Sequence, residues 1–353
     1  MTLPPSDISI GAREAALFGL AAGAGAVAVG AVGCATEPAA PGPIPDWTTE
    51  LRELAPNVFA YIQGGGPGTS NTSVSNAGLI VGEDHLLAID TLAAPLHAQA
   101  FHKAATEAGG GKPFGRVVNT HHHPDHINGN QYFLPAEIVG HEYCREAVLR
   151  IELRNPVWAA REGWALGTEE RQIVAPTATL TDKMTYWYGE TQVELLYVGP
   201  AHTWGDVVVF LPQHRILFAG DVTFSYVTPA AFNGHITKWL ETLDRIAAMD
   251  VDTIVPGHGP IHGKQELADL REYYSILKSE GQKRFEAGVS PGRAAFEVQT
   301  QHLGKFSGWN NPERVVADTV RLYDELRGTL TPAGAFAPAE ATKEYNALKE
   351  TES

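Results

Sequence analysis

Seven histidine and aspartate side chains stand in four short stretches of this 353-residue chain, and each stretch lies just beyond an apolar run. They are His121, His123, Asp125, His126, His202, Asp221 and His258. Stretches so far apart in sequence meet where a fold gathers the ends of several strands, because loops held by a rigid scaffold carry function. The pattern therefore indicates a sheet-based fold with a metal-binding site where those strands end.

The first stretch, an H-x-H-x-D-H pattern, has a spacing that suits two adjacent ions. His121 and His123 alternate by two, so on an extended segment they project to the same side. Asp125 and His126 follow where a turn into a helix can swing them towards a second ion. A carboxylate at Asp221 can bridge two ions with its two oxygens, which neutral imidazole cannot do. Two ions roughly 3.5–4 Å apart supply hydroxide at neutral pH, so the pattern predicts a hydrolytic metalloenzyme.

Strand-like apolar stretches predict two rounds of strands, each with a helix. The first round has strands at 58–63, 74–81, 86–89 and 117–119 and a helix at 95–108. The second has strands at 184–188, 192–198, 207–211, 216–219 and 253–255 and a helix at 235–249. Two such rounds indicate two sheets packed face to face with helices outside, an α/β fold. Further helices are predicted at 265–287, 291–296 and 312–327.

The chain divides by composition into four parts. Residues 1–45 form a leader and linker, 46–263 a catalytic domain, 264–328 a helical extension, and 329–353 a loose tail rich in Ala, Pro, Glu and Thr. The apolar run from Ala15 to Val32, followed by Gly33-Cys34, resembles a bacterial export signal that ends in a lipidated cysteine. We therefore expect an exported protein, periplasmic or attached to the membrane through Cys34. An uncleaved membrane anchor and a disordered arm are the alternatives.

The net charge limits the class of partner, and the cysteine content limits which side chains can bind the metal. A net charge of −15 should repel nucleic acid, so we expect a small-molecule substrate and no nucleic acid partner. The only two cysteines, Cys34 and Cys144, cannot form a sulfur cluster for zinc. The metal must be held by imidazole and carboxylate, which suits zinc, iron or manganese.

From about Glu53 to Pro260 these motifs resemble the metallo-β-lactamase superfamily of hydrolases. The resemblance implies a four-layer αββα sandwich, here with a C-terminal helical extension. It implies one metal held by His121, His123 and His202, a second held by Asp125, His126 and His258, and Asp221 bridging the two. It also implies that Asp90 supports the ligand loop. Asp125 and Asp221 are the expected catalytic residues, and two divalent ions, zinc before iron or manganese, are the expected cofactors.

Other residues near these motifs have two interpretations each. His122 is predicted to face away from both metals, and His141 either approaches the site or lies at the surface. Three aromatic residues could form a substrate wall or belong to the core: Trp204, Tyr226 and Trp239. The segment with Trp158 and Trp164 is either a lid over the pocket or a packed surface helix.

The ligand set also narrows the reaction. Asp221 occupies a position where β-lactamases of the superfamily generally lack an aspartate, whereas glyoxalase II, lactonases and other esterases have one. After His126 the chain lacks the two glycines frequent in glyoxalase II. We therefore predict a hydrolase of a small-molecule ester, lactone or similar bond that uses a metal-bridging hydroxide. A β-lactam hydrolase, a mononuclear iron sulfur dioxygenase and a non-enzymatic metal-binding protein are the alternatives.

Overall fold

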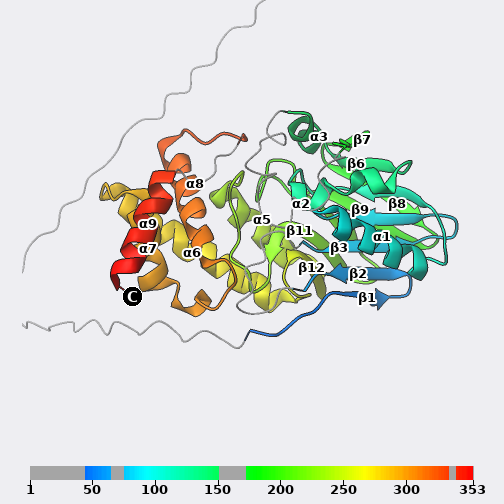
Figure 1. The fold of residues 1–353 in the computed structure, drawn as a ribbon, viewed down its shortest axis with the longest axis horizontal. Coiled ribbons are helices and arrows are strands. Elements are labelled where there is room, and N and C mark those ends of the chain that lie inside the picture. The colour runs from blue at the N-terminus through cyan, green and yellow to red at the C-terminus, as the bar shows by residue number, and fades with distance from the viewer. Residues whose placement is uncertain (1–43, 65–74, 151–171, 334–338, 353) are drawn as a thin grey trace, which may run out of the picture. The chain divides into compact units, whose positions relative to one another are not determined.

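The computed structural model describes residues 44–64, 75–150, 172–333 and 339–352, and its strands form two sheets (Figure 1). The first sheet has the order β1 (Glu50–Ala55), β2 (Val58–Ile62), β3 (Ala77–Val81), β4 (Leu86–Ile89), β5 (Phe114–Val118), β6 (Glu137–His141), β7 (Ala178–Leu180). The second has the order β12 (Thr253–His258), β11 (Ile216–Phe224), β10 (Val207–Leu211), β9 (Thr191–Tyr197), β8 (Lys183–Tyr188). In the first sheet, β1 to β4 pair antiparallel and β4 to β7 pair parallel. In the second, all pairs are antiparallel except β11 with β12.

Successive residues of the buried strands face different layers, as the two-residue period of a strand requires. In β3, Ile80 packs into the cluster between the sheets, together with Val207 and Phe218 of the second sheet. Its neighbour Leu79 packs on the opposite side, with Phe101 of helix α1 (Pro95–Ala108). The two sheets therefore stack face to face, and α1 covers the outer face of the first.

The second sheet is covered by helices that come later in the chain. Trp239 of α5 (Ile236–Ala248) and Tyr274 of α6 (Lys264–Glu286) pack with Leu217 of β11. The remaining helices are α2 (Pro124–Ile127), α3 (Glu142–Leu149), α7 (Pro291–His302), α8 (Val315–Arg327) and α9 (Ala339–Glu352), with short 3-10 turns at Asn130–Phe133, Gly304–Phe306 and Pro312–Arg314. The architecture is the predicted αββα sandwich followed by C-terminal helices.

The helices α6 to α9 form a group of their own in Figure 1, in which α7 contacts both α8 and α9. The prediction of a loose tail from residue 329 was wrong for α9. Tyr345 is 1% exposed and lies 6.2 Å, between ring centroids, from Phe296 of α7. The segment is rich in Ala, Glu and Lys, which are strong helix formers, and two apolar residues, Ala341 and Tyr345, at helical spacing bury one face.

Besides α9, three elements were not predicted: strands β1 and β7 and helix α3. β1 is a half-exposed edge strand and β7 has three residues, so neither carries a clear apolar alternation. The described residues belong to one compact unit. Within the described segments, no helix has both the length and the apolar character needed to cross a bilayer.

Candidate metal centre

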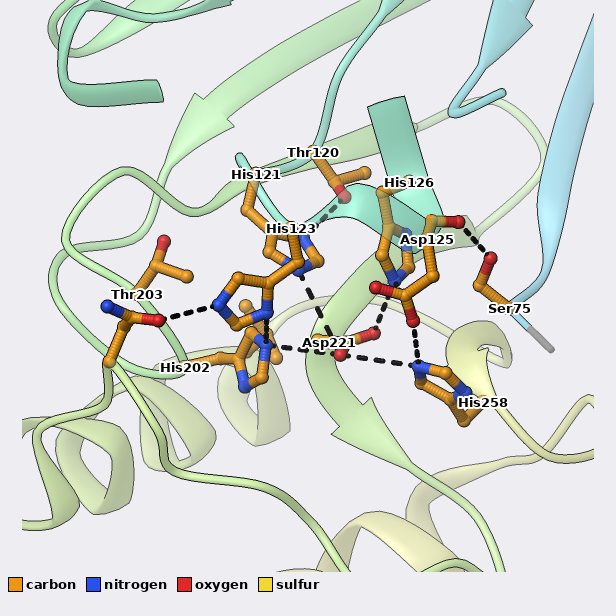
Figure 2. Close-up of polar contacts among 12 residues, drawn as sticks. Ser75, Thr120, His121, His123, Asp125, His126, His202, Thr203, Asp221 and His258 are labelled. Carbon is orange, nitrogen blue, oxygen red and sulfur yellow. Dashed lines mark hydrogen bonds and ion pairs between the residues drawn. The ribbon is translucent and has the colours of Figure 1, made fainter. Parts of the chain in front are cut away.

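The seven predicted side chains meet where strands of both sheets end (Figure 2). The segment after β5 carries His121 to His126, and the loop between β9 and β10 carries His202. Asp221 lies within β11, and His258 is the last residue of β12. Pro124 opens helix α2, whose turn separates the paired histidines from Asp125 and His126, as predicted.

The first group joins His121, His123, His202 and Asp221, whose ligand-type atoms lie within 4.8 Å of one another. The Nδ1 atom of His123 is 2.7 Å from Nε2 of His202. The Oδ2 atom of Asp221 is 3.1 Å from the same His202 nitrogen and 3.9 Å from Nε2 of His121. Three imidazole nitrogens and one carboxylate oxygen therefore converge on one point.

The second group joins Asp125, His126 and His258. The Nε2 atom of His258 is 3.2 Å from Oδ2 of Asp125, and Nε2 of His126 is 3.0 Å from Oδ1 of Asp221. Burial lowers the pKa of His126, but the surrounding carboxylates outweigh burial and raise that pKa well above its usual value. This side of the centre is thus rich in negative charge, which favours a cation.

The chemistry of these groups fits metal ions. All seven residues are buried, and Nε2 of His121 has no hydrogen-bond partner among the described residues. Such an atom is costly unless a ligand satisfies it. Burial lowers the pKa of His121 well below its usual value, and burial together with His202 lowers that of His123 to about 3. Both rings are therefore neutral, the form that binds a metal, and nitrogen with oxygen donors suits zinc, iron or manganese.

Asp90 joins the ligand loop to a ligand ring. Its Oδ2 atom is 2.7 Å from Nδ1 of His126, and its Oδ1 atom accepts a 2.8 Å hydrogen bond from the backbone N–H of Thr120. The φ angle of Asp90 is 58°, a left-handed conformation that is strained outside glycine. Strain of this kind persists where the surroundings hold it in place. Asp90 lies where the resemblance placed a supporting carboxylate.

The segment before His258 is fixed by residues that the sequence analysis missed. The side chain of Asn76 donates to the carbonyls of Pro256 (2.9 Å) and Gly259 (2.8 Å). A Cβ at Gly257 would lie 1.8 Å from Oδ1 of Asp221, so only glycine fits beside that carboxylate. The Pro-Gly-His-Gly sequence could have indicated this close approach, whereas nothing near Asn76 in the sequence points to it.

The loop that carries His202 closes on Asp206, which was also missed. Its carboxylate accepts a 2.8 Å hydrogen bond from the backbone N–H of Thr203 and another from the Thr203 hydroxyl. An aspartate that accepts from backbone nearby in sequence is a common turn device. The Thr-x-x-Asp spacing was therefore a usable signal for the turn, although not for its place beside a ligand.

Comparison with known proteins decides the family of this chain. Residues 70–258 match the family described as "Metallo-beta-lactamase superfamily", more than half of the chain and all seven residues of the two groups. The chain belongs to this superfamily.

Relatives within the superfamily act on different bonds. The chain is 25% identical over 237 residues to a linear primary-alkylsulfatase of Pseudomonas sp., covering 56% of this chain and 45% of the relative. It is 25% identical over 189 residues to a hydroxyacylglutathione hydrolase of Methylococcus capsulatus, covering 54% of this chain and 58% of the relative. The chain thus spans about half of the length of these curated relatives.

A solved structure of a sec-alkylsulfatase from Pseudomonas sp. has the same fold, with a TM-score of 0.58 at 19% identity. The match covers 85% of this chain and 54% of the other. The matched part of this chain is longer than residues 46–263, so the likeness of fold continues into the C-terminal helices.

The other predicted residues fall outside the two groups. His122 is buried, with its ring 5.7 Å from that of Tyr143. His141 caps α3, where its Nδ1 atom accepts from the backbone N–H of Tyr143, and its ring stacks on Tyr197 at 4.2 Å. Trp239 is fully buried in the core, although its ring lies 5.4 Å from that of His202. Tyr226 packs against the same core, and Trp204 is half-buried, 6.0 Å from the ring of His235.

Two further predictions lie outside the described residues. They concern the lid with Trp158 and Trp164, and the leader with Cys34. Both stay predictions. Cys144 is a buried free cysteine, and burial raises the pKa of its thiol.

Proposed function

We propose that this protein is a binuclear metallohydrolase that cleaves an ester, lactone or similar bond of a small molecule, with zinc as its expected metal. The observation that carries the proposal is the position of Asp221 between the two groups (Figure 2). One of its oxygens lies 3.0 Å from Nε2 of His126, and the other lies 3.1 Å from Nε2 of His202. A single carboxylate placed in this way can keep two cations close together.

Two divalent ions held there would lower the pKa of a water towards neutrality and polarise the bond under attack. The chain supplies the surroundings for that chemistry. The neutral rings of His121 and His123 offer lone pairs, and Asp221 offers negative charge to both sides. Asp125 places a carboxylate oxygen 3.2 Å from His258 on the second side. Burial of these groups excludes bulk water and strengthens each electrostatic contact.

An alkyl sulfate is the second candidate for the bond that is cleaved. The sequence similarity to the primary-alkylsulfatase covers 56% of this chain at 25% identity, which supports including sulfate esters among the substrates to be tested. Two further substrates test the other enzymatic alternatives. A β-lactam tests for a β-lactam hydrolase, and a persulfide tests for a sulfur dioxygenase.

The test is a panel of substrates on protein loaded with zinc: a chromogenic ester, a lactone, a thioester, an alkyl sulfate and a chromogenic β-lactam. Turnover of an ester, a lactone or a sulfate ester that stops on chelation supports the proposal. Absence of turnover across the panel by fully loaded protein would favour a metal-binding protein without catalytic activity. An iron-containing preparation that consumes oxygen with a persulfide would instead indicate a dioxygenase.

A further inference from the structure

His123 differs from the other histidines of the centre in the ring nitrogen that faces inward. Its Nδ1 atom faces His202, at 2.7 Å, whereas its Nε2 atom points outward to Oδ1 of Asn233 at 2.8 Å. The other four face neighbouring ligand-type atoms with Nε2: His121, His126, His202 and His258. Something must therefore select the opposite nitrogen in His123.

Asn233 can make that selection because its amide has a fixed orientation. Its Nδ2 group donates to the carbonyl of Pro332 at 3.2 Å. Turning the amide over would place two acceptor oxygens against each other, so Oδ1 must face His123. A carbonyl oxygen only accepts, so these partners assign the ring proton of His123 to Nε2. The lone pair of Nδ1 is then left for a metal.

The loop that carries Asn233, residues 225–235, is held by residues of the C-terminal extension. The backbone N–H of Asn310 donates to the carbonyl of Tyr226 at 3.0 Å, and the N–H of Thr228 donates to the carbonyl of Asn310 at 2.9 Å. Arg314 donates to the carbonyl of Thr228 at 2.9 Å. Tyr226 has a φ angle of 55°, an outlier for a bulky residue that persists only under such constraint.

Helix α8 holds the second half of the same loop with a buried polar face. Asp318 and Arg321 are three residues apart and lie on one side of the helix. Asp318 accepts from the backbone N–H of Ala231 at 2.8 Å, and Arg321 donates to the carbonyl of Gly234 at 2.9 Å. Arg321, only 2% exposed, also donates to the carbonyl of Thr331 at 3.0 Å. Gly234 adjoins Asn233, and Thr331 adjoins Pro332. Arg321 therefore holds both ends of the hydrogen bond that orients the Asn233 amide.

We propose that Asn233 is a positioning residue that holds His123 in the tautomer needed at the first metal, and that α8 maintains this arrangement through Arg321. The C-terminal extension thus acts on the metal centre through a chain of hydrogen bonds. This inference rests on the proposed binuclear centre. Residues that orient a ligand in this way typically change metal affinity about 10–100-fold.

The test compares two substitutions at Asn233. Asn233→Leu removes the acceptor at similar size. Asn233→Asp keeps an acceptor facing Nε2 of His123 in either orientation, although it gives up the donor to the carbonyl of Pro332. Each protein is dialysed against a chelator at a concentration that leaves wild type with two zinc ions, and its metal content is then measured. Cobalt titration followed by visible absorption reports the affinity of each site. Thermal unfolding of the metal-free proteins checks that the fold is kept.

We expect Asn233→Leu to retain one ion, because its affinity for the ion at the first site falls about 10–100-fold. We expect Asn233→Asp to retain two ions. Arg321→Met should weaken the first site in the same direction. Thr319→Val is the control on the same helix, and it should retain two ions. Among the described residues, the Thr319 hydroxyl bonds only within α8, to the carbonyl of Val315. If Arg321→Met does not fold, the two Asn233 variants still test the positioning role of Asn233.

Two results would overturn the inference. One is wild-type affinity at both sites in Asn233→Leu. The other is equal loss in Asn233→Leu and Asn233→Asp, which would mean that the acceptor does not matter. A wild-type protein that binds fewer than two ions would instead contradict the proposed function, so the two failures are distinguishable.

Discussion

His126 and His123 belong to the same centre but are held by different parts of the molecule. His126 is held by Asp90, a carboxylate at the end of a strand of the first sheet. His123 is held by Asn233, a neutral amide in a loop that the C-terminal helices fix. We therefore expect the support of His126 to come from the sandwich, and the support of His123 to depend on the C-terminal extension as well. The C-terminal helices are therefore part of what shapes the centre.

Asp221→Ala should have the largest effect, because the two carboxylate oxygens of Asp221 face one histidine in each group, His126 and His202. Without the shared anion the two ions would repel each other, and the second should be lost or displaced. Because a catalytic metal pair typically supplies several kcal/mol of transition-state stabilisation, kcat should fall roughly 1,000-fold on the substrate that the panel identifies. Circular dichroism should show the fold retained, since the change is a truncation.

His122→Ala is the matched control for that experiment. It lies between two ligand-type histidines but outside both groups, so most activity should remain. Equal loss of activity in the two folded variants would contradict the ligand assignment. Full activity and two ions in Asp221→Ala would contradict the bridging role.

Asp90→Asn should weaken the second metal more than the first, in contrast to Asn233→Leu. An amide NH₂ facing Nδ1 of His126 would leave the ring proton on Nε2, the nitrogen that faces the centre. We expect affinity for the second ion to fall about 10–100-fold. Affinity for the first ion should fall less, because Asp90 acts on His121 indirectly, through the Thr120 hydroxyl. Cobalt titration measures both. Loss of the first ion alone would show that the two supports had been assigned to the wrong sites.

The smallest effect concerns Asp318 in α8, and it tests how the extension holds the loop. Burial raises the pKa of this carboxyl to about 7, although Ala231, Tyr273 and Arg314 oppose the shift. Between about pH 4 and pH 7 the folded state holds a proton that the unfolded state has released. The stability contributed by this group is therefore full at low pH and is lost as pH rises through 7.

Asp318→Asn cannot ionise, so at pH 8.5 it should melt about 3–6 °C above wild type. The difference should shrink as pH approaches 4. Melting curves across this range check the expectation, with Thr319→Val as the neighbouring control. Parallel pH profiles for wild type and Asp318→Asn would mean that the carboxylate is ionised when folded, and that charge contributes to its contact with the loop.

The sequence predicted the layers and the ligand-type residues because their signals are local. Short continuous apolar runs mark β3 and β4. The H-x-H-x-D-H spacing places its four side chains by simple geometry. The supports were harder to find because their partners are distant. Asn233 precedes a glycine and reads as a turn residue, while its contact with His123 spans 110 positions. The role of α8 is likewise invisible in a sequence whose apolar pattern shows only a helix.

Metal content tests the central claim most directly. Protein purified without chelator, and then made replete with zinc, should contain two ions per chain by elemental analysis, because both groups are complete in the folded chain. A reproducible single ion per chain under these conditions would contradict the binuclear centre.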